Sequence, residues 1–371
     1  MTDNWPISER HVHLQGGLLA INPPQSEKIS LWPTTTDNKN LELKLATYAS
    51  FYSKLKALKL EIIGVEFITH EGEAIGSSPP QWRPYAEQKK IWVNWDAFQL
   101  WGQLGNSAYS HKNGLFYDLS KRIAYQLSSL SERLKELSLA YRAQLNALWI
   151  KGNPELGGRF QDGFTELTYQ KFQSFLFESC ILRDYLSELV YNFSRSGELK
   201  DQKKEITTAG GLLKLLRNKS DLTDLEAEFL NIMGSDGWLK ELGDYRDLVM
   251  HSAPISMVNH KLYCIKEVVN LPSDKVVQAV RFPIPRDPGA LYKERSRRED
   301  FDRYVRQFEL IAKAALEAYG KYDCLQYAHK ATNLLSNLAL SCASLSPYKP
   351  MVQKFVKTDA GMRSEFRYVS S

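Results

Sequence analysis

The stretch DLSKRIAYQLSSLSERLKELSLAYRAQLNALWI, residues 118–150, carries the clearest helical pattern in the chain. Apolar residues return at three- and four-residue steps along it, a spacing that places them on one face of a helix. These residues are Leu127, Leu130, Leu134, Leu137, Tyr141, Leu145 and Leu148. A stripe of this kind usually packs into the core of a helical bundle. The stretch therefore predicts a long core helix.

The residues that follow predict a second, helical domain. The segment 151-KGNPELGGRFQDG-163 is dense in glycine and proline, which favours a domain boundary near residue 155. Beyond it, helical patterns cover residues 165–193, 210–233, 236–251 and about 299–341, with a loop and a small strand pair expected within 255–292. We predict a helical bundle over residues 156–345 and a polar C-terminal tail over 346–371.

The N-terminal part, residues 1–155, also predicts a largely helical domain with irregular or short-strand segments. Residues 1–37 are rich in proline, threonine and glycine, which favours an irregular or weakly stranded arm. Residues 40–60 predict a helix, because apolar side chains recur at helical spacing. They are Leu41, Leu45, Tyr48, Tyr52, Leu55 and Leu58. The fold class predicted for the whole chain is therefore mainly α.

Composition narrows the class of protein. Of 371 residues, 43% are hydrophobic and 25% charged, as in ordinary folded domains, and the net charge of +5 permits binding to a polyanion. The N-terminus lacks the basic and apolar regions of a secretory signal, and no apolar run approaches the roughly 20 residues of a membrane helix. We expect a cytoplasmic protein without membrane contact. Four separated cysteines predict reduced structural thiols rather than paired zinc ligands: Cys180, Cys264, Cys324 and Cys342.

One aromatic segment, residues 92–117, concentrates Trp92, Trp95 and Trp101. Exposed aromatic rings beside lysine and histidine can stack on single-stranded nucleic acid bases. Tryptophan is more often buried, so we favour packing between helices for these three residues.

The stretch 245-YRDLVMH-251 holds the strongest candidate site. On a helical wheel for residues 236–251 an apolar stripe faces inward, formed by Trp238, Leu242, Tyr245 and Val249. Arg246 and His251 lie off that stripe, about 140° apart at 100° per residue. Asp247 and His251 stand four residues apart and share one face. Gly243 leaves room for close approach by another helix.

The chemistry of these three side chains suits a phosphodiester. Pro254 disfavours helix at the residue before it, which places His251 in the last turn, where the helix dipole favours imidazolium. Asp247 would orient the imidazole, His251 would move a proton, and Arg246 offers a planar fork for phosphate oxygens. The alternative is a solvated helix face, since an Arg and a His at this spacing also arise by chance.

The residues 242-LGDYRDLVMH-251 resemble the signature of the HEPN superfamily, the higher-eukaryote and prokaryote nucleotide-binding domains. That signature is an arginine and a histidine separated by four to six residues, the first of which is polar. Here the three residues are Arg246, Asp247 and His251. The resemblance covers about residues 160–345 and implies an all-α bundle. It also implies a metal-independent endoribonuclease without a cofactor, acting as a toxin or in phage defence, with a composite site in a homodimer.

The implied reaction is attack of an RNA 2′-hydroxyl on the adjacent phosphate, with His251 assisting proton transfer and Arg246 stabilising the phosphate charge. An antitoxin or a defence-system partner is a further implication. Many such toxins are silenced by modification of a tyrosine two residues after the histidine. That position is Ala253 here, which argues against this form of control.

Other candidate sites are weaker. The segment 293-KERSRRED-300 could hold the RNA backbone or could form a solvated charged turn. Its basic residues are Lys293, Arg295, Arg297 and Arg298. His11 and His13 have no clustered partners, so we expect no metal site there. No P-loop, GxGxxG or GxSxG motif is present, and no cofactor is expected. Two hypotheses remain: a HEPN-type endoribonuclease, or a non-catalytic helical module for interaction or nucleotide binding.

Overall fold

The computed structural model describes residues 8–68, 79–150, 155–194, 205–251, 263–272, 274–293, 322–358 and 361–368, together with 300–302, 305–306, 309–310 and 313. The chain forms two compact units, each assembled from segments that are discontinuous in sequence. The first unit takes residues 1–92, 131–176 and 244–330, and the second takes 93–130, 177–243 and 331–371. Each unit therefore draws on both sides of the boundary predicted near residue 155.

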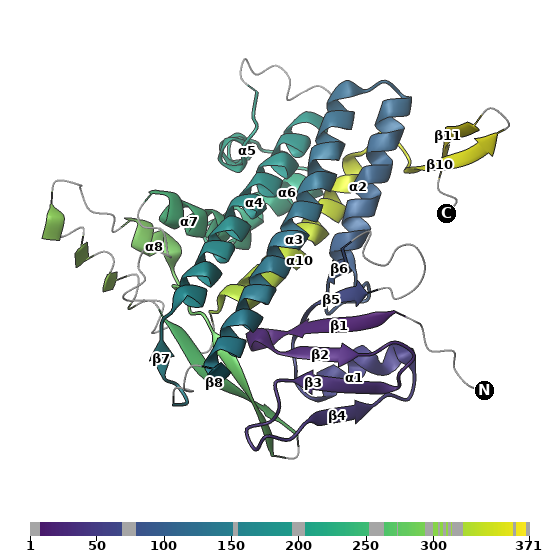
Figure 1. The fold of residues 1–371 in the computed structure, drawn as a ribbon. Helices are drawn as coiled ribbons and strands as arrows, with labels where there is room; N and C mark the ends of the chain where they lie inside the picture. Colours follow the sequence, from purple (N-terminus) through teal and green to yellow (C-terminus); the bar gives the residue numbers. More distant parts are fainter. Residues whose placement is uncertain are drawn as a thin grey trace. The chain divides into compact units, whose positions relative to one another are not determined.

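A six-stranded antiparallel sheet in the order β4-β3-β2-β1-β5-β6 dominates the N-terminal part of the first unit (Figure 1). Its strands are β1 (Glu9–Leu14), β2 (Leu19–Asn22), β3 (Lys28–Trp32), β4 (Leu41–Lys44), β5 (Ile62–Ile68) and β6 (Gln81–Pro84). The chain is 56% helical and 19% strand. The prediction of a mainly α fold was therefore wrong, and the fold mixes α and β.

The wrong prediction came from assigning a helical repeat to apolar residues that also fit the two-residue repeat of a strand. Residues 41–45, LELKL, are compatible with a helix through Leu41 and Leu45, but they also alternate apolar and charged side chains. In the structure Leu41 is buried while Glu42 and Lys44 are exposed, as on a half-buried strand. The helix predicted over 40–60 is replaced by β4, the short η2 turn (Tyr48–Ser50) and α1 (Phe51–Ala57). The arm predicted over 1–37 is β1, β2 and β3, an ordered part of the sheet.

The two faces of the sheet follow from the alternation of side chains along β1. On one face the Arg10 guanidinium lies under the rings of Tyr48 and Phe51, 3.5 and 4.3 Å from their centroids. Its Nη2 donates to Asn22 Oδ1 at 2.8 Å, and burial lowers the pKa of Arg10. On the other face His13 points towards the C-terminal half of α3 (Gly114–Ile150), where its Nδ1 lies 2.9 Å from Ser138 Oγ.

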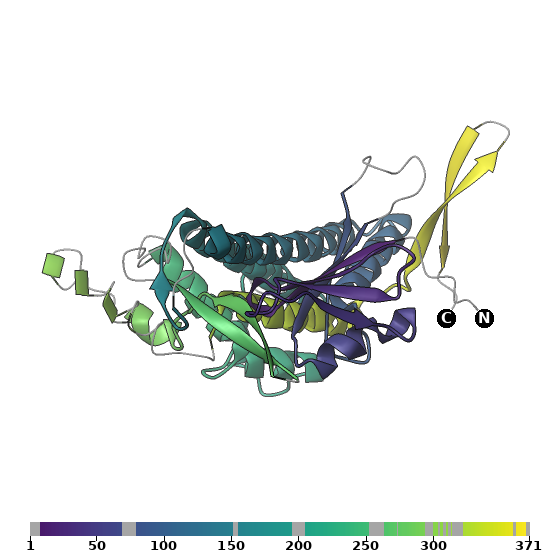
Figure 2. The same cartoon turned by 60° about the horizontal axis from the view of Figure 1, so that its bottom comes forward.

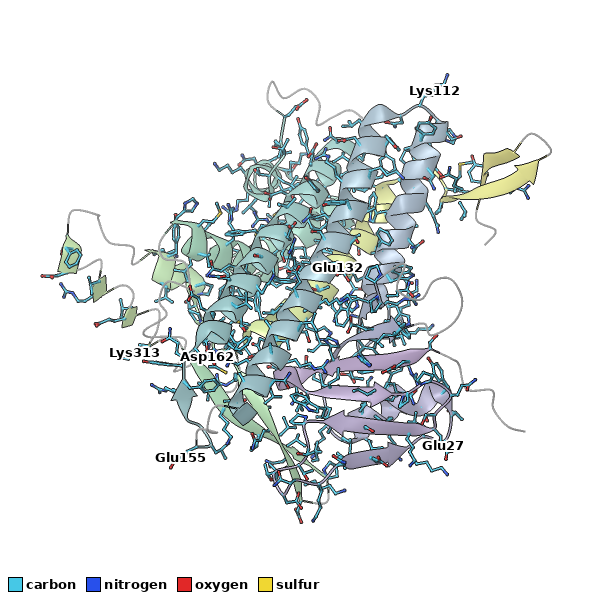
Figure 3. All side chains as sticks on the ribbon, in the orientation of Figure 1. Glu27, Lys112, Glu132, Glu155, Asp162 and Lys313 are labelled. Carbon is cyan, nitrogen blue, oxygen red and sulfur yellow. The ribbon has the colours of Figure 1, made fainter. Side chains whose placement is uncertain are left out.

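The helix predicted over 118–150 is confirmed as α3, and every residue of its predicted stripe is buried. The helix predicted from residue 165 is α4 (Gly163–Phe193), and Asp162 begins it by accepting hydrogen bonds from the Phe164 and Thr165 amides (Figure 3). The small strand pair expected within 255–292 is present as β8 (Cys264–Leu271) and β9 (Lys275–Arg281), with β7 (Arg159–Phe160) at the edge of this second sheet. Figure 2 shows β8 and β9, in green, in a view that brings the bottom of Figure 1 forward.

The segment Phe282–Pro285, which follows β9, exchanges hydrogen bonds with residues at several helices of the first unit. Tyr169 of α4 donates its hydroxyl to the Pro283 carbonyl at 3.0 Å, and Tyr245 of α7 (Trp238–His251) donates to the Pro285 carbonyl. Asp323, directly before α10 (Cys324–Cys342), accepts from the Phe282 amide at 3.0 Å. Four helices of this unit are thereby aligned on one short segment, since Tyr141 of α3 donates to the same carboxylate at 2.6 Å.

The buried Asp323 carboxylate also caps α10, because its Oδ1 accepts from the Leu325 and Gln326 amides at 2.9 and 3.1 Å. Burial raises the pKa of Asp323 to about 6, although the four donors act in the opposite direction. Burial likewise raises the pKa of Tyr141 well above its ordinary value.

The second unit contains α2 (Val93–Ser110), α5 (Ala209–Leu216), α6 (Asp224–Ile232) and the remaining parts of α3, α4, α7 and α10. The tail predicted over 346–371 contains the hairpin of β10 (Met351–Thr358) and β11 (Gly361–Tyr368). Trp101 is fully buried here and donates to the Ala339 carbonyl at 2.9 Å, as expected of a packing residue. The four cysteines are buried and carry free thiols, as predicted.

Within the part of the chain that the structure describes, every helix falls short of the length and apolar character needed to cross a membrane.

Tyr141→Phe tests the dependence of the first unit on Asp323. Removing the hydroxyl leaves a buried carboxylate with one donor fewer, which should lower the free energy of unfolding by about 1–3 kcal/mol. It should also raise the pKa of Asp323 further, measurable by carboxyl-carbon NMR. The control is Tyr125→Phe, because Tyr125 is 72% exposed on the same helix. Equal losses in urea unfolding for the two variants would contradict this account.

Candidate functional site

The candidate site lies on α7, which ends at His251. Its buried face is wider than the predicted stripe. Leu242, Tyr245 and Val249 are buried as predicted, Trp238 is half-buried, and Leu239 and Leu248 are buried as well. A helix contacted from more than one side buries such a broad face. The remaining surface carries Arg246, Asp247 and His251.

The part of α7 within the first unit is held firmly by Tyr245. Besides the hydrogen bond to Pro285, its ring contacts Tyr327 at 4.8 Å and Phe172 at 6.4 Å between centroids. Both contacts are edge-on, the arrangement that aromatic pairs favour. Rotation of α7 about its axis would break all three contacts, so the direction of its polar face is fixed by packing.

Two glycines at α7 and α8 leave space that charged side chains occupy. A Cβ on Gly243 would lie 2.6 Å from Arg183 Nη1 of α4, within the second unit. A Cβ on Gly289 of α8 (Pro288–Lys293) would lie 2.7 Å from Asp244 Oδ2, within the first unit. The room predicted beside Gly243 is thus occupied by an arginine side chain rather than by a helix backbone.

Arg246 pairs with its neighbour in sequence. Its Nε lies 3.1 Å from Asp247 Oδ1, and the two side chains are 29% and 35% exposed. Its Nη1 lies 3.7 Å from Met250 Sδ. The carboxylate therefore restrains the guanidinium at the helix surface while part of the planar fork stays open to solvent.

His251 is exposed and stands apart from Arg246 along the helix. Its ring lies 6.3 Å from the Tyr292 ring of α8. The sequence suggested that Asp247 orients this imidazole, whereas in the structure the ion pair of Asp247 is with Arg246. The predicted helix end at Pro254, and Ala253 with it, lie outside the described residues.

Of the four basic residues in the segment 293–300, the structure describes only Lys293. Lys293 is exposed at the end of α8, next to Tyr292. Arg295, Arg297 and Arg298 lie outside the described residues, so their predicted contact with RNA stays a prediction. Lys293 and His251 belong to the same unit, and α8 brings Tyr292 against His251.

Sequence reasoning missed a buried polar network around His13. His13 Nε2 lies 3.1 Å from Glu66 Oε2, and Lys135 Nζ lies 2.8 Å from the other oxygen of that carboxylate. The Trp82 ring packs edge-on against the imidazole at 4.9 Å. Trp82 fits only because Gly64 lacks a side chain, since a Cβ there would lie 2.3 Å from the indole. Alternation along β1 could have placed His13 on this face, but its partners come from β5, β6 and α3.

The charges of the network are set by burial and hydrogen bonding. Burial lowers the pKa of His13, and this effect outweighs that of Glu66, which raises the pKa. The neutral imidazole is therefore favoured. Burial alone would raise the pKa of Glu66, but hydrogen bonds from His13 and Lys135 lower it to about 2. A neutral His13 that donates from Nε2 to Glu66 accepts at Nδ1 from the Ser138 hydroxyl.

Serine, histidine and glutamate in this order also occur in nucleophilic catalysis. Here Ser138 and His13 are each 2% exposed and Glu66 is 8% exposed. A substrate could not reach the Ser138 hydroxyl, so we assign the network to the attachment of the sheet to α3. Among the described residues, no three His, Cys, Asp or Glu side chains come together as a metal-binding group.

No protein-family model, no curated protein and no solved structure matches the chain. The residues of α7 and the resemblance of residues 242–251 are therefore the features that point to a function.

Glu66→Gln should lower the free energy of unfolding at pH 7 by about 1.5–3 kcal/mol, because it removes a charged acceptor from His13 and Lys135. The pKa of Glu66 in the folded protein, about 2, lies below its ordinary 4.5. The contribution of the carboxylate is therefore complete above pH 4.5 and lost as the pH falls towards 2. Urea unfolding at pH 7, 4.5 and 3 should show the two proteins converging in stability.

Glu42→Gln is the control for this measurement, because its ion pair with Lys28 spans 3.7 Å between two exposed side chains. Its stability should match the wild type at each pH. A difference between wild type and Glu66→Gln that stays constant from pH 7 to pH 3 would refute the role of the ionised carboxylate.

Proposed function

We propose that this chain is a metal-independent endoribonuclease of HEPN type that acts as a homodimer. The observation that carries the proposal is the accessibility of His251 and Arg246 on a helix whose opposite face is fixed by buried Tyr245. Residues kept only for packing would be covered, whereas His251 is exposed and the half-buried Arg246 keeps part of its guanidinium open to solvent, both on a rigid support. The resemblance of 242–251 to the HEPN signature supplies the reaction class.

The spacing of the two residues explains why a second copy is needed. Arg246 and His251 point about 140° apart around a single helix, so one chain does not direct both towards one phosphate. Two copies related by a two-fold axis would present two arginines and two histidines to a shared substrate. The fixed orientation of α7 lets such a composite site form without rearrangement of the helix.

The reaction begins when a neutral His251 accepts the proton of the RNA 2′-hydroxyl, whose oxygen attacks the adjacent phosphorus. The bond from phosphorus to the 5′-oxygen breaks, and His251 of the partner subunit, as imidazolium, donates a proton to that leaving oxygen. Arg246 stabilises the negative charge that builds on the phosphate oxygens. The products are a 2′,3′-cyclic phosphate and a 5′-hydroxyl, and arginine supplies the charge that a metal ion provides in other nucleases.

Asp247 enters the proposal as a positioning residue for Arg246, because its ion pair restrains the guanidinium. Lys293 and the neighbouring Arg295, Arg297 and Arg298 would hold the RNA backbone by charge. An RNA substrate implies action in the cytoplasm, as a toxin or a defence effector restrained by an antitoxin or a defence-system partner.

Arg246→Ala and His251→Ala should each abolish cleavage of a labelled single-stranded RNA by purified protein. Both side chains lie off the buried face of α7, so the free energy of unfolding should change by less than about 0.5 kcal/mol. Replacing the 2′-hydroxyl at the scissile position by hydrogen should block the reaction, and EDTA should not. In cells, expression of the wild type but not of His251→Ala should arrest growth.

Matched controls are His11→Ala and Arg217→Ala, which remove a histidine and an arginine from other surfaces. Both should cleave as the wild type does. Equal cleavage by all five proteins would assign the activity to a contaminant. Absence of cleavage by the wild type, with several RNAs and with a protein dimeric by sedimentation, would favour a non-catalytic interaction module.

A further inference from the structure

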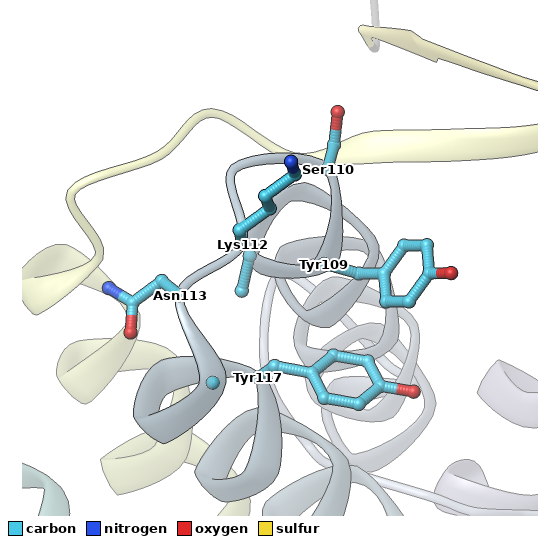
Figure 4. Close-up of a pocket in the computed structure, with 7 residues that line it drawn as sticks. Tyr109, Ser110, Lys112, Asn113 and Tyr117 are labelled. Atoms are coloured by element: carbon cyan, nitrogen blue, oxygen red, sulfur yellow. The ribbon is translucent and has the colours of Figure 1, made fainter.

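The turn between α2 and α3 lines an open hollow of about 490 Å³, within the second unit (Figure 4). Tyr109 closes α2 and Tyr117 stands in the first turns of α3, and both rings extend to the same side of the turn. Ser110 and Lys112 supply polar groups at its rim. A volume of this size suits a small organic ligand, since such sites span about 300–1,000 Å³.

The apolar part of the hollow is a pair of aromatic rings, of which Tyr109 is exposed. The Tyr109 and Tyr117 centroids lie 5.6 Å apart with the rings tilted by 52°, and Tyr109 is 61% exposed. Tyr117 is half-buried, and the Lys121 ammonium lies 5.7 Å from its ring centroid. The two rings are not stacked face to face, so Tyr109 keeps a face that a planar, π-bearing ligand would cover, with the edge of Tyr117 beside it.

Lys112 occupies a backbone conformation that lysine avoids. Its φ of +56° lies in the left-handed region, at the position after a helix where glycine is usual. Its amide and that of Asn113 bond back to the carbonyls of Tyr109 and Ala108 at 3.0 Å, which closes α2. The left-handed conformation costs a non-glycine residue stability, as it also does at Lys59, where φ is +60°. Over the described ranges, no carboxylate lies within ion-pair distance of the Lys112 ammonium.

The polar groups of Asn113, which lines the hollow, already have hydrogen-bond partners within the protein, so they are not available to a ligand. Asn113 Nδ2 donates to the Tyr348 hydroxyl at 3.2 Å, and Asn113 Oδ1 accepts from the Phe116 amide at 3.1 Å. His111 stacks on the Tyr348 ring at 4.4 Å. The turn is thus held in shape, which leaves the Ser110 hydroxyl and the Lys112 ammonium for a ligand. Lys112 lies at the outer end of this turn (Figure 3).

We propose that this hollow binds a nucleoside phosphate, either free or at the end of a single-stranded RNA. The base would stack on Tyr109 and Tyr117, the phosphate would pair with Lys112, and a ribose hydroxyl would bond to Ser110. One aromatic surface, one cation and one hydroxyl match the three parts of a nucleotide, whereas a neutral sugar would leave the ammonium without a partner. The proposal does not depend on the ribonuclease activity, because none of its residues belongs to α7.

The experiment uses the full chain carrying His251→Ala, so that RNA stays intact. Isothermal titration with adenosine 5′-monophosphate should show one saturable site per chain. Tyr109→Ala and Tyr117→Ala should each weaken binding about ten-fold or more, since stacking on one ring contributes about that much. Ribose 5-phosphate, which lacks the base, should bind at least ten-fold more weakly than the nucleotide.

Lys112→Gly separates binding from folding. Glycine relieves the left-handed backbone, so the melting temperature should rise while binding of adenosine 5′-monophosphate weakens and binding of adenosine stays unchanged. Lys59→Gly is the matched control, because Lys59 has φ +60° after α1 and lies outside the hollow. It should raise the melting temperature without changing binding. Tyr125→Ala, at an exposed tyrosine of α3 outside the hollow, should also bind as the parent does.

A hexamer of riboadenylate distinguishes the two sources of the ligand. Tighter binding of the hexamer than of the mononucleotide, lost in Tyr109→Ala, assigns the hollow to RNA ends. The reverse order assigns it to a free nucleotide. The proposal is wrong if neither ligand saturates the protein at millimolar concentration, if both tyrosine variants bind as the parent does, or if ribose 5-phosphate binds equally well. Failure here leaves the cleavage assay on Arg246 and His251 unaffected, and failure of cleavage leaves this titration unaffected.

Discussion

Hydrogen bonding to the Phe282–Pro285 segment is the constraint on which the first unit depends. Prolines at 283 and 285 have no amide hydrogen, so this segment cannot continue the β8–β9 ladder as a paired strand. Its carbonyls instead accept tyrosine hydroxyls from α4 and α7, while Asp323 takes the Phe282 amide. A buried carbonyl without a donor is costly, so each tyrosine is needed where it stands. The direction of the polar face of α7 follows from this arrangement.

The sequence predicted α3, α4 and α7 well and the sheet poorly, for a physical reason. Contacts within a helix are local, so the stripe of α3 and the buried Tyr245 of α7 can be read from spacing alone. A strand is defined by partners far along the chain, and β1 pairs with β5 about fifty residues later. The stretch 41–45 satisfied both periods, and tertiary pairing selected the strand. The hydrogen bonds from Tyr169 and Tyr245 to proline carbonyls produce no periodic pattern in the sequence, so spacing does not predict them.

Some features of the candidate site on α7 could likewise be predicted from the sequence, and others could not. The exposure of His251 and the partial exposure of Arg246 follow from their places on the helical wheel, which the sequence supplies. The ion pair of Arg246 with Asp247 depends on side-chain conformation, and the contact of His251 with Tyr292 depends on the position of α8. The helical wheel predicts neither of them. The segment 92–117 was marked by its tryptophans, of which Trp101 packs inside. The ring that stands open is Tyr109, at the end of α2, and it lies beside the half-buried Tyr117 of α3.

The enclosure of Arg10 has a consequence for how the protein opens. Helix α1 has seven residues, too few to persist in water by itself. Tyr48 and Phe51, at its start, cover a guanidinium that belongs to β1 in the centre of the sheet. Separating α1 from the sheet would break both contacts between the rings and the guanidinium. It would also leave the Arg10 charge in a site that has lost part of its covering side chains. The amides of α1 should therefore exchange with solvent together with those of β1, as one cooperative unit, and not by fraying of an isolated short helix.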